Sequence, residues 1–220
     1  QDSAKFLQYE KDVVEPTYQA LKAELLDKNI FEPIAIYAYY PCISWDNKIY
    51  IFDKKYLFNS LEEAKNVPPL SEAIKVLEFP RQKRKPFRCI ADFFANDRLD
   101  VIAFTLASAG LKISDYERSL YDKGEFTKYY QVHGLGVELA EALAEVLHKQ
   151  IRLDLDIVPK EGHTLNDVQM KQYVGCRYSP GYAACPDLAM NRDIFDLLNP
   201  EEFGIELSET FQMHPEQTTC

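Results

Sequence analysis

Two runs rich in β-branched and aromatic residues lie close together near the start of the chain. PIAIYAYYPC (residues 33–42) and KIYIFD (residues 48–53) flank a short segment that contains Asp46 and Asn47. Such runs on either side of a polar turn predict a β-hairpin, whose two strands are antiparallel neighbours. Further strands are expected at VLEFP (76–80), CIADFF (89–94), DVIAFTLAS (100–108) and IELSETFQM (205–213).

Helical patterns precede and separate these runs. Residues 4–28 carry apolar side chains at helical spacing, and Pro16 is expected to kink or restart that helix because proline lacks a backbone donor. Ser60 with Glu63 forms a capping-box pattern, which predicts the start of a short helix.

A second capping box, Ser114 with Glu117, predicts a helix that reaches about Tyr130. The other expected elements are a break at Gly134 and Gly136, a longer helix over residues 137–152, a connection with a short helix over residues 153–172, an irregular loop over residues 175–187 and a helix over residues 192–198.

Strands separated by helices and joined by hairpin-like turns predict an α+β fold with a largely antiparallel sheet. A doubly wound parallel sheet is disfavoured, because the glycine-rich loop between a strand and a helix that such folds carry is missing. The 220 residues, of which 46% are hydrophobic, fit one globular domain.

The composition excludes several classes of function. A formal net charge of −10 disfavours binding to nucleic acid, which is itself a polyanion. The sequence has neither an apolar run of membrane-spanning length nor a secretory signal pattern, so we expect a cytoplasmic protein with no membrane partner. The five cysteines form no CxxC pair and the four histidines are widely spaced, which predicts no metal site.

The segment RYSPGY (residues 177–182) is the first candidate for binding chemistry. Proline followed by glycine is typical of a type II turn, which should bring Arg177 and Tyr182 close together. An arginine held on such a turn can clamp a carboxylate with two parallel hydrogen bonds. The alternative is an arginine on a surface turn that pairs with a nearby acid.

The helix pattern GVELAEALAEVLHKQIR (residues 136–152) is the second candidate. Its polar side chains form one row made of Glu138, Glu141, Glu145 and His148. Such a row can be a solvated stripe, or Glu141 can serve as the anionic partner of a positively charged ligand group.

A cluster of five cations is the third feature. Because the chain is otherwise acidic, this cluster can be an exposed loop or a docking or phosphate-contact patch. Asp92, a short way beyond, can be a satisfied buried carboxylate in a strand or a ligand contact. The five cations are Arg81, Lys83, Arg84, Lys85 and Arg88.

Together these residues resemble the activation domain of cobalamin-dependent methionine synthases, the module that binds S-adenosylmethionine. The resemblance covers roughly residues 30–220 and rests on several motifs in the same order, which is more specific than one short pattern. They are FPRQ…CIADFF, LAEALAEVLHKQIR, the RxxxGY signature at Arg177, Gly181 and Tyr182, the ACPD segment that follows it, and the ending GIELSETFQMHPEQTT.

The resemblance implies a single α+β domain with a twisted, largely antiparallel sheet flanked by helices. It also implies that Arg177 meets the ligand carboxylate, that Tyr182 lies near the methionyl portion and that Glu141 is the helix carboxylate of the site. The backbone of Tyr178 is expected to contribute. Gly181 and Ala183 are small residues where a bulky macrocycle could approach, and no catalytic side chain is nominated.

By the same resemblance, the domain binds S-adenosylmethionine for the reductive methylation of inactive cob(II)alamin, in which the methyl group passes to cob(I)alamin. The implied partners are the corrinoid-binding domain of the same enzyme, which carries the cobalamin, and a one-electron donor such as flavodoxin. A stand-alone reactivase for another corrinoid protein and a non-catalytic binding or docking domain remain alternatives.

The ends of the chain depart from the family pattern. The aspartate that the family places before the first helix would precede Gln1, and a strand would follow Cys220. We therefore expect residues 1–220 to be an activation domain truncated at both ends.

Overall fold

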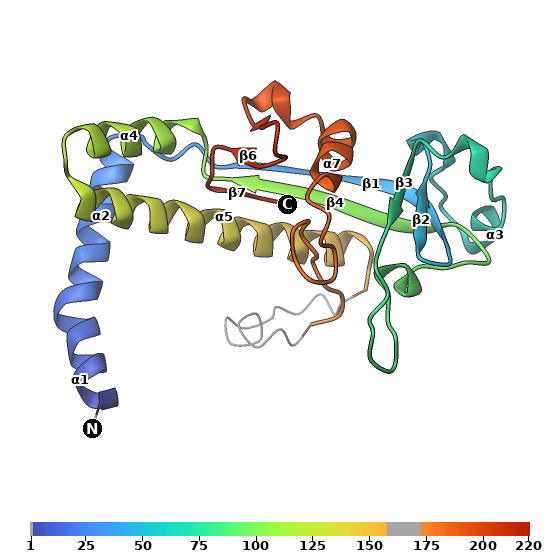
Figure 1. Cartoon of the computed structure of the whole chain (residues 1–220), viewed down its shortest axis with the longest axis horizontal. Helices are drawn as coiled ribbons and strands as arrows, with labels where there is room; N and C mark the ends of the chain where they lie inside the picture. Colours follow the sequence, from blue (N-terminus) through green and yellow to red (C-terminus); the bar gives the residue numbers. More distant parts are fainter. Residues whose placement is uncertain (1, 158–172) are drawn as a thin grey trace.

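The computed structural model describes residues 2–157 and 173–220. Its main sheet has five strands in the order β3-β2-β1-β4-β7, and every neighbouring pair is antiparallel (Figure 1). The predicted α+β class and the largely antiparallel sheet are confirmed. The strands are β1 (Ile34–Trp45), β2 (Lys48–Ile51), β3 (Lys75–Glu78), β4 (Asp100–Ser108) and β7 (Thr218–Thr219).

Strand β1 organises the sheet because it has different partners at its two ends. Residues 34–42 pair with β4, and residues 42–45 pair with β2 across the predicted hairpin. Asp46, at the turn, adopts a φ of 55°, a left-handed conformation that aspartate tolerates better than most residues. The hairpin prediction is therefore confirmed, and β2 and β3 lie at one end of the long β1–β4 pair (Figure 1).

The strand predicted at CIADFF is wrong. Residues Ile90–Phe93 form a short 3₁₀-helix, η4, in which the Asp92 carboxylate accepts a hydrogen bond from the Cys89 backbone N–H at 2.8 Å. An aspartate three residues after a helix start satisfies a backbone donor that has no partner inside the helix. This local cap replaces strand pairing despite the apolar composition of the segment.

Two helices cover opposite faces of the β1–β4 pair, α5 (Phe126–Asp154) and α7 (Met190–Leu198) (Figure 1). Leu106 packs in the main core with α7, whereas its neighbour Ala107 packs against Ala144 and Leu147 of α5. This division follows from the alternation of side chains along a strand. Tyr40 ties α7 to the sheet by donating a hydrogen bond to the Leu197 carbonyl at 2.6 Å.

The N-terminal pattern forms α1 (Asp2–Tyr9) and α2 (Glu15–Asp27), joined by the π-helical turn η1 (Glu10–Val14). The Glu15 N–H donates to the Glu10 carbonyl, five residues back. Because Pro16 has no N–H, the regular ladder is interrupted beside it, and the wider turn accommodates the ring. The predicted disturbance at Pro16 is thus a π-turn between two helices that run on from each other (Figure 1).

The predicted break at Gly134 and Gly136 is wrong, because α5 runs through both glycines. The second capping box is also wrong: α4 (Leu111–Asp122) begins before Ser114 and ends well before Tyr130. Ser114 and Glu117 instead form a polar network with Gln217. Ser114 Oγ lies 3.2 Å from Gln217 Oε1, and Gln217 Nε2 donates to the Glu117 carboxylate at 2.7 Å.

The first capping box is confirmed, because Ser60 Oγ accepts from the Glu63 N–H at 3.2 Å and α3 follows directly. The final predicted strand is corrected to a small hairpin, β5 paired with β6. Within the described residues no helix has the length and apolarity needed to cross a membrane. The remaining elements are η2 (Lys54–Tyr56), α3 (Leu61–Ala64), η3 (Leu70–Glu72), η5 (Pro200–Phe203), β5 (Glu206–Leu207) and β6 (Met213–His214).

Of residues 153–172, the predicted connection, only 153–157 lie within the described part of the chain, and the short helix expected there lies outside it. Residues 153–154 complete α5.

Candidate functional site

The RYSPGY loop lies between residue 173 and α7 and is irregular, as predicted. Gly181 adopts a φ of 95°, in agreement with the Pro180–Gly181 pair, and its N–H donates to the Cys185 carbonyl at 2.8 Å. Cys185 in turn donates to the Tyr182 carbonyl at 2.9 Å. Because Pro180 and Cys185 are buried, the loop is anchored at both sides of its exposed turn.

Arg177 of this loop reaches back to the C-terminal half of α5. Its Nη2 donates to Glu145 Oε1 at 2.6 Å, and the Oε2 atom of Glu141 lies 3.6 Å from the same nitrogen. The Arg177 side chain is 23% exposed, so its guanidinium is partly accessible from solvent. Sequence reasoning nominated both Arg177 and Glu141, and the structure brings them together; it also shows the pairing with acids that was the alternative.

The other predicted site residues lie at the solvent-facing part of the loop. Tyr182 is 72% exposed and Tyr178 is 44% exposed, and Gly181 and Ala183 are exposed as well. The ion pairs of Arg177 are made with α5, whereas Tyr182 extends into solvent. The turn therefore presents an aromatic side chain while α5 holds the arginine.

A layer of buried side chains stands behind Glu145. The Tyr173 hydroxyl donates to Glu145 Oε2 at 3.3 Å, and the Arg152 guanidinium carbon lies 4.1 Å from the centre of the Tyr173 ring. His148 meets the same ring edge-on, with centroids 5.1 Å apart. Sequence reasoning placed His148 in the polar row but missed Arg152 and Tyr173, although Arg152 continues the row four residues after His148.

Burial shifts the protonation of this layer. His148 is 7% exposed, and its pKa is lowered to about 4, first by desolvation and then by the positive charges of Arg152 and Arg177, against an opposing effect of Glu145. Burial also raises the pKa of Tyr173, with Glu145 adding to the effect. His148 is therefore a neutral imidazole at pH 7.

This neutral histidine makes stability depend on pH. An unfolded histidine titrates near 6.5, whereas folded His148 titrates near 4, so its contribution is complete above about pH 6.5 and is lost as the pH falls. For wild type, this group should lower the free energy of unfolding by about 2 kcal/mol between pH 7 and pH 5. Urea unfolding of His148→Gln at both pH values should show a correspondingly smaller difference, whereas His214→Gln, at an exposed position, should retain it. An unchanged difference in His148→Gln would refute the assignment.

The basic cluster forms an exposed loop between β3 and η4, as one of the two alternatives held. Arg81 donates to both carboxylate oxygens of Asp92, at 2.7 and 2.8 Å, and to the Phe87 carbonyl at 2.8 Å. Arg81 and the Cys89 N–H lower the pKa of Asp92. Asp92, half-exposed in a 3₁₀-helix and not buried in a strand, thus holds the loop closed.

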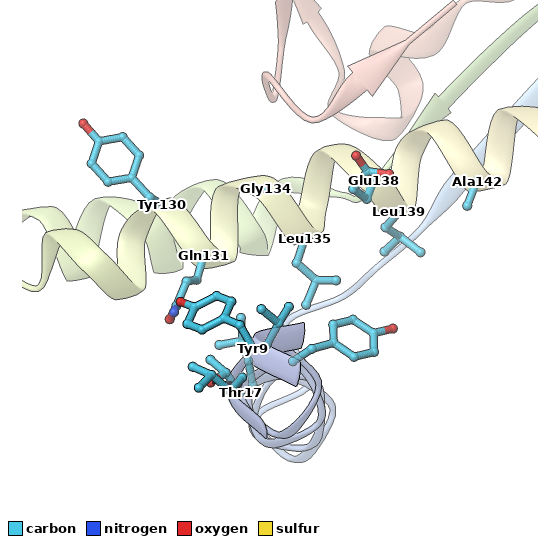
Figure 2. A pocket seen from close by; sticks show the side chains of 13 residues that line it. Tyr9, Thr17, Tyr130, Gln131, Gly134, Leu135, Glu138, Leu139 and Ala142 are labelled. Atoms are coloured by element: carbon cyan, nitrogen blue, oxygen red, sulfur yellow. Dashed lines mark hydrogen bonds between the residues drawn. The ribbon is translucent and has the colours of Figure 1, made fainter. Parts of the chain in front are cut away.

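An apolar groove of about 660 Å³ separates the N-terminal helices from the first half of α5. Figure 2 shows Tyr9 and Thr17 of the N-terminal segment opposite Gln131 and Leu135 of α5. Sequence reasoning did not predict this groove, because it arises where two distant helices meet. None of the predicted site residues lines it.

Comparison with known proteins identifies the family. Residues 4–220 match the model of the vitamin B12 dependent methionine synthase activation domain. Methionine synthase of Mycobacterium tuberculosis strain H37Rv is 36% identical over 197 residues, which are 84% of this chain and 16% of that protein. Methionine synthase of Mycobacterium leprae is also 36% identical, over 84% of this chain and 15% of its own length.

A solved structure described as the MetH reactivation domain bound to AdoHcy has the same fold, with a TM-score of 0.80 at 24% identity. The likeness covers 96% of this chain and 66% of that one. The chain spans about one sixth of the curated relatives that it matches. From the family match and the identity to these relatives, we conclude that the chain belongs to the family of vitamin B12 dependent methionine synthase activation domains.

Proposed function

We propose that this chain is the S-adenosylmethionine-binding module for the reductive methylation of cob(II)alamin in a cobalamin-dependent methionine synthase. The single observation that carries the proposal is that charged atoms of Arg177 and Glu141 lie 3.6 Å apart at a partly exposed surface, in a chain of this family. The structural neighbour, whose name states that it is bound to AdoHcy, and the methionine synthase relatives support it.

The charges of these residues fit the proposed ligand. S-adenosylmethionine carries a carboxylate, an ammonium group and a sulfonium at neutral pH. Arg177 supplies planar N–H donors that match a carboxylate, and Glu141, with a side chain 52% exposed, can accept the ammonium group. Binding would replace the contact between these two side chains with one contact to each end of the zwitterion, so that no unpaired charge is buried.

The exposed part of the loop would complete the site. Tyr182 is accessible enough to pack along the methionyl portion, and the backbone of Tyr178 is within the same turn. The small residues Gly181 and Ala183 are exposed beside them and leave room for a macrocycle presented from outside. These assignments follow the family motif and remain proposals.

The chemistry requires no acid or base from this chain. A cobalamin carried by the corrinoid-binding domain of the same enzyme would supply the nucleophilic cobalt, and the sulfonium is already a good leaving group. The residues here would bind and orient the methyl donor, which is a proximity effect, so we nominate no catalytic side chain. An electron donor such as flavodoxin and a cytoplasmic location complete the proposal.

Titration calorimetry with S-adenosylmethionine tests this function directly. We expect saturable binding of one ligand per chain at pH 7, because the site offers one arginine and one accessible carboxylate. S-adenosylhomocysteine keeps the amino-acid portion and should compete for the site. If no binding of either compound is detected at millimolar concentration, the proposal fails.

A further inference from the structure

Two carboxylates of α5 reach the same nitrogen of Arg177, but they do so unequally. Glu145 lies 2.6 Å from Nη2 with a side chain 26% exposed, whereas Glu141 lies 3.6 Å away with a side chain 52% exposed. A contact of 2.6 Å is a charge-assisted hydrogen bond, and one of 3.6 Å is only an ion pair. Glu145 therefore makes the stronger and drier contact.

Glu145 is itself held from behind. Its second oxygen accepts from the Tyr173 hydroxyl at 3.3 Å, and Tyr173 is packed between His148 and Arg152. Arg152 is 1% exposed, so a positive charge is buried close to the Glu145 carboxylate. This arrangement favours the ionised carboxylate where it is, since a buried cation needs a nearby anion.

Glu141 has no comparable support within the described residues. It lies one helical turn before Glu145 on α5, and its only polar side-chain contact in that part of the chain is the ion pair to Arg177. Its side chain can therefore leave Arg177 at little cost, whereas Glu145 would have to give up two hydrogen bonds. The guanidinium has further N–H groups besides the one that Glu145 occupies, and these can face an incoming carboxylate.

We infer that Glu145 is a positioning residue of the S-adenosylmethionine site: it fixes one edge of the Arg177 guanidinium so that the remaining N–H groups receive the ligand carboxylate. Glu141 is then the exchangeable partner, which turns from Arg177 to the ligand ammonium group. This inference rests on the proposed function. It assigns to Glu145 selectivity for ligands that carry a carboxylate, a role that neither the family motif nor the RYSPGY loop defines.

The test compares two ligands that differ only in that group, S-adenosylmethionine and decarboxylated S-adenosylmethionine. For Glu145→Gln, we expect the affinity for S-adenosylmethionine to fall about tenfold, because a charge-assisted contact that orients Arg177 is lost. The affinity for the decarboxylated compound should change less than about twofold, since that ligand makes no contact with Arg177. A general structural defect would weaken both ligands equally.

The matched control is Glu138→Gln, which removes the same charge from a more N-terminal position on the same helix, away from Arg177. It should leave the preference between the two ligands at the wild-type value. Should Glu145→Gln fail to retain the wild-type circular dichroism spectrum, Tyr173→Phe removes only the hydroxyl that supports Glu145 and should shift the preference in the same direction by about twofold.

The outcomes separate the two proposals. If wild type binds neither compound, the proposed function is refuted and this inference with it. If wild type binds S-adenosylmethionine but Glu145→Gln loses affinity for both ligands equally, gains affinity for S-adenosylmethionine or behaves like Glu138→Gln, the proposed function stands and the positioning role is refuted.

Discussion

Replacing Arg177 with alanine is expected to weaken the binding of S-adenosylmethionine by about 1.5–3 kcal/mol, which is roughly 10- to 150-fold in affinity. The side chain pairs with both Glu141 and Glu145 and would provide the paired hydrogen bonds to the ligand carboxylate. Because the free protein already pairs Arg177 with two acids, binding exchanges contacts and does not only add them. The loss should therefore not exceed the value for one charged pair. Titration calorimetry at fixed ionic strength measures it.

The control for this variant is Arg192→Ala. Arg192 on α7 is also partly exposed and also paired with a glutamate, Glu201, at 3.3 Å. Its removal changes the net charge equally but leaves the RYSPGY loop and α5 untouched. An affinity of Arg177→Ala equal to that of Arg192→Ala would take Arg177 out of the site.

Replacing Gly136 with valine is expected to lower the free energy of unfolding by about 2–3 kcal/mol. A Cβ atom at this position would lie 2.4 Å from Ile113 Cδ1 and 2.8 Å from Gln217 Cγ. Both neighbours are fully buried, and the Gln217 side chain is further fixed by its hydrogen bonds to Glu117, so neither can move away freely. Crowding therefore outweighs the gain in helix propensity, which is at most about 1 kcal/mol over glycine. Urea denaturation measures the change.

Gly134, two residues earlier in the same helix, provides the matched control. A Cβ at Gly134 meets no described atom within 4 Å, and Gly134→Ala should raise the free energy of unfolding by about 0.5–1 kcal/mol through helix propensity alone. The two variants should thus move stability in opposite directions. If Gly136→Val were as stable as wild type, the close packing of α4, α5 and Gln217 would be disproved.

These two glycines show where local sequence reasoning fails. Both were predicted to break the helix, because glycine is a poor helix former, yet α5 runs through both. Gly136 is needed for a close approach by residues 113 and 217, which are distant in sequence. The Ser114–Glu117 pair misled for the same reason: its spacing matches a cap, but its hydrogen bonds are made to Gln217.

The candidate site was predictable in part. The RYSPGY turn and the acidic row on α5 are local patterns, and the resemblance to a family linked Arg177 with Glu141. The row itself gave no reason to choose among its glutamates, and Glu145 proved to be the nearer partner of Arg177. Tyr173 and Arg152 were missed because each acts only through neighbours supplied by another segment.

The sequence by itself determined the features that depend on neighbouring residues: the hairpin at Asp46, the cap at Ser60, the disturbance at Pro16 and the left-handed Gly181. These are set by backbone geometry and short-range hydrogen bonds, which a few adjacent residues suffice to define. Only the tertiary structure decided how α5 continues through its glycines, which carboxylate binds Arg177 and which groups are buried behind it. Those outcomes depend on packing and desolvation between segments far apart in the chain, and no local pattern contains that information.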